Sequence, residues 1–90
     1  MLIQWNEKTA AWFEAASEYT KFHEKLASLL LPVMPSRGSL VDLGCGVGLI
    51  DFALAGAVDE ITCMDKSEAA LSPLRRMAAE RGTKNLRIEC

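Results

Sequence analysis

Three glycines at alternate positions, Gly44, Gly46 and Gly48, constrain the fold of this chain more than any other feature. They follow the apolar run 39–43, typical of a short buried strand, and precede residues 49–54, whose apolar side chains recur at helical spacing. A strand that turns sharply into a helix exposes backbone N–H groups, which a ligand can approach only where no Cβ intervenes. We therefore expect Gly44 and Gly46 to form a ligand-accessible turn, and Gly48 to let the helix pack closely on the sheet.

The alternation of strand and helix continues beyond this turn. Residues 61–64 are expected to form a second buried strand, followed by a helix that Ser67 caps and Gly82 ends. Pro73 leaves two alternatives, a kink in that helix or a new segment capped by Ser72. Residues 85–90 are typical of the start of a third strand. The pattern predicts an α/β fold, a Rossmann-like doubly wound parallel sheet that is incomplete at about three strands.

A helical segment, residues 1–35, is expected to precede the sheet unit, residues 36–90. Residues 7–31 have helical periodicity, with a possible break at Thr20, and Pro32 and Pro35 end the run. The apolar side chains that recur at steps of three and four are expected to pack inward: Trp12, Ala15, Ala16, Tyr19, Phe22, Leu26, Leu29 and Leu30.

Composition excludes several classes of protein. With 90 residues, 50% of them hydrophobic, and a net charge of −2, the chain has room for one domain and no basic excess for nucleic acid or an anionic membrane. Its apolar runs are too short to span a bilayer. Cys45, Cys63 and Cys90 form no C-x-x-C pair, and His23 is the only histidine, so neither a metal site nor a disulfide framework is predicted. We expect a cytoplasmic protein in which Cys63 is a small buried hydrophobe.

Two acidic residues indicate the kind of ligand. Asp65 stands at the end of the second strand, about 20 residues after Gly44, the first glycine. This spacing suits an acid that accepts hydrogen bonds from ribose hydroxyls. A dinucleotide fingerprint needs a small residue where Leu49 stands, and no Gly-Lys-Ser/Thr sequence follows to make a P-loop. Asp42 beside the turn favours a ligand with an ammonium or sulfonium centre over a pyrophosphate. Alternatively, Asp42 is hydrogen-bonded to the backbone of the turn.

The sequences VDLGCGVG (41–48) and ITCMDKSEAAL (61–71) resemble the glycine-rich and ribose-binding motifs of class I S-adenosylmethionine-dependent methyltransferases. The resemblance covers about residues 36–90. It implies that the chain is the first part of a methyltransferase, cut within the third of seven strands. The cofactor would be S-adenosylmethionine, with S-adenosylhomocysteine as product, and the unidentified methyl acceptor is expected to be a small molecule.

The resemblance also implies roles for single residues around the glycine-rich turn. Gly44, Cys45 and Gly46 would contact the methionine part of the cofactor through their backbone, and Gly48 completes this turn. Asp42 would help to place the ammonium group.

Three further positions concern the rest of the cofactor site. Asp65 would bind the ribose hydroxyls, and Lys66 stands where the family usually has an apolar residue against the adenine, so that only its aliphatic stem could cover the ring. Tyr19 would either pack in its helix or cover the cofactor as a lid. No general base is identified, and His23 is not expected to be one.

Two other functions remain open. One is a non-catalytic nucleotide-binding or interaction domain that forms a homodimer through an exposed sheet edge. The other, disfavoured by Leu49, is a nicotinamide-dependent oxidoreductase.

Overall fold

The computed structural model describes residues 4–35 and 37–90, and its centre is a parallel sheet of three strands. The strands are β1 (Ser39–Leu43), β2 (Glu60–Met64) and β3 (Leu86–Glu89), in the order β1-β2-β3. The register pairs Asp42 with Cys63 and Cys63 with Ile88. The α/β, Rossmann-like prediction is confirmed.

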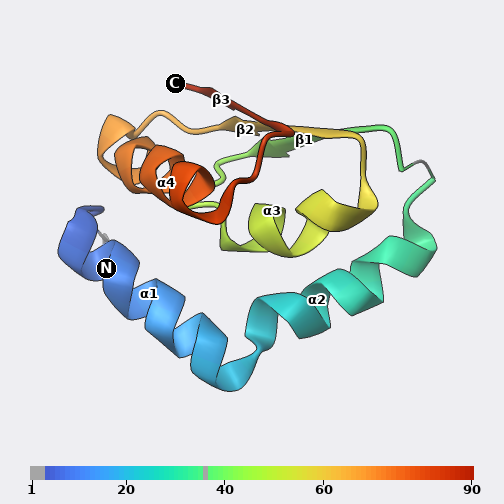
Figure 1. Ribbon diagram of the computed structural model, residues 1–90, viewed down its shortest axis with the longest axis horizontal. Helices are drawn as coiled ribbons and strands as arrows, with labels where there is room; N and C mark the ends of the chain where they lie inside the picture. Colours follow the sequence, from blue (N-terminus) through green and yellow to red (C-terminus); the bar gives the residue numbers. More distant parts are fainter. Residues whose placement is uncertain (1–3, 36) are drawn as a thin grey trace.

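All helices of the described chain lie on one side of this sheet (Figure 1). The crossover from β1 to β2 contains α3 (Leu49–Leu54) and the 3₁₀ turn η2 (Ala55–Ala57), and the crossover from β2 to β3 contains α4 (Glu68–Arg81). Because both crossovers run in the same direction across the sheet and parallel crossovers are right-handed, both helices fall on the same face. Helices α3 and α4 therefore belong to one of the two helix layers that flank a doubly wound sheet.

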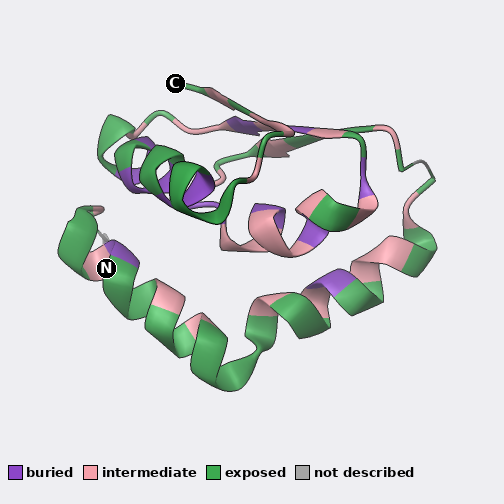
Figure 2. Cartoon of the chain, viewed as in Figure 1, coloured by how far each residue is buried: buried purple, intermediate pink, exposed green. Residues whose placement is uncertain are grey.

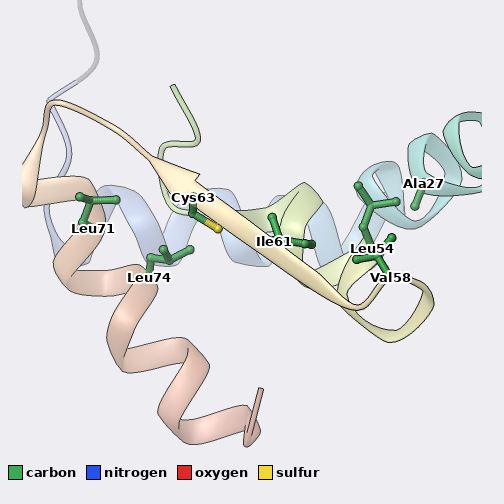
Figure 3. Packing of buried hydrophobic residues seen from close by; sticks show 7 residues of the cluster. All are labelled: Ala27, Leu54, Val58, Ile61, Cys63, Leu71 and Leu74. Carbon is green, nitrogen blue, oxygen red and sulfur yellow. The ribbon is translucent and has the colours of Figure 1, made fainter. Parts of the chain in front are cut away.

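The core lies between the sheet and these helices. Its fully buried side chains come mainly from β2 and α4, and Figure 3 shows seven members of the cluster: Ala27, Leu54, Val58, Ile61, Cys63, Leu71 and Leu74. Cys63 is completely buried, as expected for a small hydrophobe. Hydrogen bonding with Cys45 and burial raise the pKa of the Cys63 thiol, so it remains protonated.

Helix α4 is continuous through Pro73, which is buried within it. The alternative in which Ser72 caps a second segment is therefore wrong. Ser67 occupies the N-cap, but its side chain makes no capping hydrogen bond. At the other end Gly82 takes the left-handed conformation, with φ +67°, and its N–H bonds back to the last turn as predicted.

The N-terminal segment forms two helices, α1 (Glu7–Thr20) and α2 (Phe22–Leu30), followed by the 3₁₀ turn η1 (Leu31–Val33). Asn6 and Thr9 form a reciprocal capping box at the start of α1. The break predicted at Thr20 is found one residue later, at Lys21, whose φ of +56° is left-handed. The boundary between the two predicted units falls at Ser36, which lies outside the described residues, as do residues 1–3.

The prediction that the large apolar residues of these helices pack inward is wrong for most of them. Tyr19 is 91% exposed and Leu29 73%, and Trp12 and Phe22 are also exposed. The buried positions are Ala10 in α1 and Ala27 in α2, as the mostly exposed outer helices in Figure 2 illustrate. The small side chains of Ala10 and Ala27 let α1 and α2 approach α3 and α4 closely, so the bulky residues of α1 and α2 remain on the outside. Periodicity identified the helices but not the face that they bury.

Gly48 is expected to be the least replaceable glycine of the fold. Its φ is +74°, and a Cβ there would overlap Leu74 Cδ1, which is buried in α4. We expect Gly48→Ala to lower the free energy of unfolding by about 3 kcal/mol, from left-handed strain and overpacking together. Urea denaturation would measure this loss. Gly82→Ala is the matched control, because its φ of +67° is similar but its surroundings are open. An equal loss in both variants would show that the Leu74 contact contributes nothing.

Candidate functional site

The glycine-rich turn at the carboxyl end of β1 is anchored to the end of β2. The N–H groups of Gly44 and Cys45 both donate to the Met64 carbonyl, at 2.7 and 3.0 Å. Gly48 N–H then donates to the Cys45 carbonyl at 3.0 Å and α3 begins. Gly44, Gly46 and Gly48 all have positive φ, between +58° and +74°. This backbone path is open to glycine and strained for other residues, which explains the motif.

The three glycines have different surroundings. A Cβ at Gly44 would meet nothing within 4 Å, whereas one at Gly46 would lie 3.2 Å from the Trp5 ring and one at Gly48 would enter Leu74. Gly48 therefore allows close packing of the helices on the turn, as predicted. Gly44 presents bare backbone to open space at the sheet edge.

Asp65, at the end of the neighbouring strand β2, holds the turn in place through hydrogen bonds. Its Oδ2 accepts a hydrogen bond from Gly46 N–H at 2.9 Å, and its Oδ1 accepts one from Ser67 N–H at 2.8 Å. Each carboxylate oxygen has two lone pairs, so both can accept a further hydrogen bond. The predicted ribose acceptor thus also has a structural role, which its position in the sequence did not reveal.

Two open depressions meet at Asp65 and Lys66. One, of about 450 Å³, is lined by Leu43, Gly44, Met64, Asp65, Lys66 and Cys90. The other, of about 490 Å³, is lined by Gln4, Trp5, Asp65, Lys66, Ser67 and Ala69. The structure therefore brings Gly44, Asp65 and Lys66 together around connected surface at the carboxyl edge of the sheet. This is where ligands bind in open α/β sheets.

Trp5 is a residue of this region that sequence reasoning missed. Its indole lies over Gly46 and its ring centroid is 5.0 Å from that of Phe13 on α1. Trp5 precedes the helix and belongs to no periodic pattern, so no sequence signal linked it to a turn 41 residues away. The N-terminal segment thus contacts the glycine-rich turn through Trp5, whereas Tyr19 is almost fully exposed on α1.

Asp42 and Cys45 lie beneath the turn. Cys45 is half-buried, and its Sγ is 3.4 Å from the Gly46 carbonyl. Asp42 lines a different cavity from Asp65, an apolar one of about 360 Å³ between β1, α2 and α3. Its Oδ2 is buried, and no donor among the described groups contacts it.

His23 lies at the start of α2 and lines a depression with Trp5, Cys45 and Gly48. Its Nδ1 is 2.6 Å from Ser17 Oγ, and burial lowers the pKa of its ring, so His23 is neutral at pH 7.

Comparison with known proteins identifies the family. The model of the methyltransferase small domain family matches residues 22–89. The chain belongs to this family.

Relatives and solved structures agree with this assignment. The chain is 31% identical over 88 residues to ubiquinone biosynthesis O-methyltransferase from Aromatoleum aromaticum, covering 92% of this chain and 37% of that protein. The fold is similar to that of an S-adenosyl-L-methionine-dependent methyltransferase, described as putative, from Methanococcus maripaludis, with a TM-score of 0.80, 18% identity and coverage of 99% and 43%. It is also similar to the N-terminal domain of EvdMO1 with S-adenosylhomocysteine bound, with a TM-score of 0.67, 19% identity and coverage of 73% and 28%. The chain thus spans well under half of these proteins.

A buried acid is a further feature of this methyltransferase domain that sequence analysis did not identify. Asp51 lies in the first turn of α3 and has no exposed surface. Neither of its carboxyl oxygens has a donor among the described groups. Burial, and then hydrogen bonding with Asp42, raise the pKa of Asp51 to about 8. Hydrogen bonding with Cys63 opposes this rise, and the proton held on Asp51 can be donated to Asp42.

In this domain the stability contributed by Asp51 is expected to fall as the pH rises. In the unfolded chain an aspartate loses its proton near pH 4, whereas folded Asp51 keeps it to about pH 8. The folded state binds the extra proton between these values, so the free energy of unfolding decreases across this window. Asp51→Asn is neutral at every pH and should be more stable than the wild type at pH 8, by about 1 to 3 kcal/mol.

Urea denaturation at pH 5 and pH 8 would check this expectation, with a smaller gain at pH 5. Asp59→Asn removes an exposed carboxylate and is the matched control, for which no such difference is expected. A gain for Asp51→Asn that is the same at both pH values would contradict a buried, protonated Asp51.

Proposed function

We propose that this chain forms the cofactor-binding part of an S-adenosylmethionine-dependent methyltransferase. The observation that carries the proposal is the juxtaposition of Gly44 and Asp65 at one edge of the sheet. Gly44 offers backbone without a Cβ to open space, and Asp65 offers carboxylate lone pairs to the same depression. Such an edge fits a ligand with a ribose and a flexible polar tail.

The remaining groups fit the same cofactor. Asp42 lies directly before the glycine-rich turn, and its carboxyl would bind the ammonium group, directly or through water. The backbone of Gly44, Cys45 and Gly46 would hold the methionine part. Lys66 is exposed beside Asp65, so its aliphatic stem can lie along the adenine while the ammonium stays in water.

The chemistry of such an enzyme resides largely in its cofactor. The bound cofactor supplies an electrophilic methyl group on a sulfonium centre. The residues of this chain would bind and orient it, and Trp5 would limit the access of water from the side of α1. The acceptor is proposed to be a small molecule, and the similarity to an O-methyltransferase from Aromatoleum aromaticum favours an oxygen as its reacting atom. No residue of the chain is proposed as a catalytic base.

Binding of S-adenosylhomocysteine tests this proposal. We expect the purified protein to bind it in isothermal titration calorimetry and Asp65→Ala to bind at least tenfold more weakly, because the variant loses the ribose acceptor and the bond to Gly46. Asp59→Ala is the charge-matched control, and urea denaturation would verify that each variant is folded. NAD, as the second ligand, tests the oxidoreductase alternative. A folded wild-type protein that does not bind S-adenosylhomocysteine would refute the proposal.

The fluorescence of Trp5 offers a second check on the position of the site. Trp12 is exposed on α1, so Trp12→Phe leaves Trp5 as the sole indole, beside Gly46. We expect S-adenosylhomocysteine to shift the emission of this variant, while Trp5→Phe, which retains only Trp12, shows little change. The reverse pattern would place the ligand away from the glycine-rich turn.

The proposal extends to location and assembly. Cys45, Cys63 and Cys90 are all unpaired, which supports a reducing compartment such as the cytoplasm. No helix in residues 4–35 and 37–90 has the length and apolar character needed to cross a bilayer. A homodimer through the exposed edge of the sheet is also proposed, and the exposed Val41 and Leu43 on the face of the sheet away from the helices would add apolar surface to such an interface.

A further inference from the structure

The buried carboxyl of Asp51 has no part in the functions described above, although it lies directly beneath the glycine-rich turn. A Cβ built on Gly48 would be 3.4 Å from Asp51 Oδ2, so the carboxyl points back toward the turn and not along α3. It shares its cavity with Asp42, and the two form a hydrogen-bonded pair when one is protonated. A buried carboxyl is costly without polar partners, and the partners of Asp51 are Cys63, through a hydrogen bond, and Asp42, which lines the same cavity.

The proton of this pair belongs on Asp51. Asp51 is fully buried, whereas Asp42 is only partly so, and the more deeply buried carboxyl is the harder to ionise. The titratable groups that act on Asp51 are Asp42 on β1 and Cys63 on β2, and Cys45 acts on Cys63 in turn. Cys63 stays protonated and no base is among these groups, so Asp42 is the acceptor that the Asp51 proton faces.

We propose that Asp51 is a positioning residue, whose carboxyl donates its proton to Asp42 and so holds the Asp42 carboxyl in orientation for the ammonium group of the cofactor. This inference rests on the proposed function. Asp51 does not touch the ligand and acts only through Asp42. Without the donor, Asp42 would face an apolar cavity with an unpaired oxygen, and its carboxyl would lose its fixed orientation.

Two variants separate this role from simple packing. Asp51→Asn has nearly the same shape and keeps an N–H donor for Asp42, whereas Asp51→Val has a similar volume and no donor. In calorimetry at pH 7 we expect Asp51→Asn to bind S-adenosylhomocysteine within about threefold of the wild type. Asp51→Val should bind about tenfold more weakly, the scale of one lost hydrogen bond to a charged group. Asp59→Asn is the control for a lost charge.

A titration of the wild-type protein makes the test independent of these variants. With ¹³C-labelled aspartate, the carboxyl signal of Asp51 reports its proton directly. A cation bound at Asp42 favours the ionised pair, so S-adenosylhomocysteine should lower the pH at which Asp51 titrates. This readout requires no methyl acceptor and no turnover.

The outcomes distinguish this proposal from the one on which it rests. Binding that is equal in Asp51→Val and Asp51→Asn, or a titration of Asp51 that the ligand does not move, would overturn the positioning role and leave the cofactor site intact. A folded wild-type protein that fails to bind the ligand would overturn both. Weaker binding by Asp51→Val alone, with a titration that moves, would support both.

Discussion

The structure depends on a chain reversal that glycine makes possible and that Asp65 holds in place. β1 ends, turns through three residues with positive φ and enters α3 within a few residues. Two backbone N–H groups of this turn donate to the Met64 carbonyl, and a third, that of Gly46, donates to Asp65. The turn thereby joins the carboxyl ends of β1 and β2 into one rigid edge. The core beneath it and the depression above it both take their shape from this edge.

The contact between Gly48 and Leu74 joins the glycine-rich turn to helix α4. Because Gly48 has no Cβ, the side chain of Leu74 in α4 reaches the turn itself. Close packing at this point sets the depth at which α3 and α4 lie against the sheet. The N-terminal helices then approach this layer through Ala10 and Ala27. The larger aromatic residues remain exposed on α1 and α2, and Trp5, which precedes them, reaches the glycines.

The buried acids beneath the turn represent a cost in stability that a purely structural core would avoid. An apolar residue at position 51 would need neither a proton nor a partner. Asp51 instead lies beside Asp42 in one cavity, so two carboxyls lie close to the predicted ligand site. Where a sequence places an acid in a position that packing alone would fill with a small apolar residue, a functional reason is the natural hypothesis.

The sequence by itself determined the order of the elements and the position of the turn. Alternating glycines after an apolar run, and an acid at the end of the next strand, have few structural solutions, so β1, β2, α4 and the placement of Asp65 were predictable. The N-terminal helices were predictable as helices, because periodicity reports the backbone. The face that they bury was not, because bulky apolar residues satisfy the helical period whether or not a partner covers them.

Only the tertiary structure decided what each residue contacts. Asp65 bonds to the turn as well as facing the depression, Trp5 lies over Gly46, and Asp51 lines the same cavity as Asp42. These contacts join residues that are distant in the sequence or that lie on different elements, and they depend on the depth at which helices settle against a sheet. That depth follows from the close packing of side chains in three dimensions, which no local pattern of residues records.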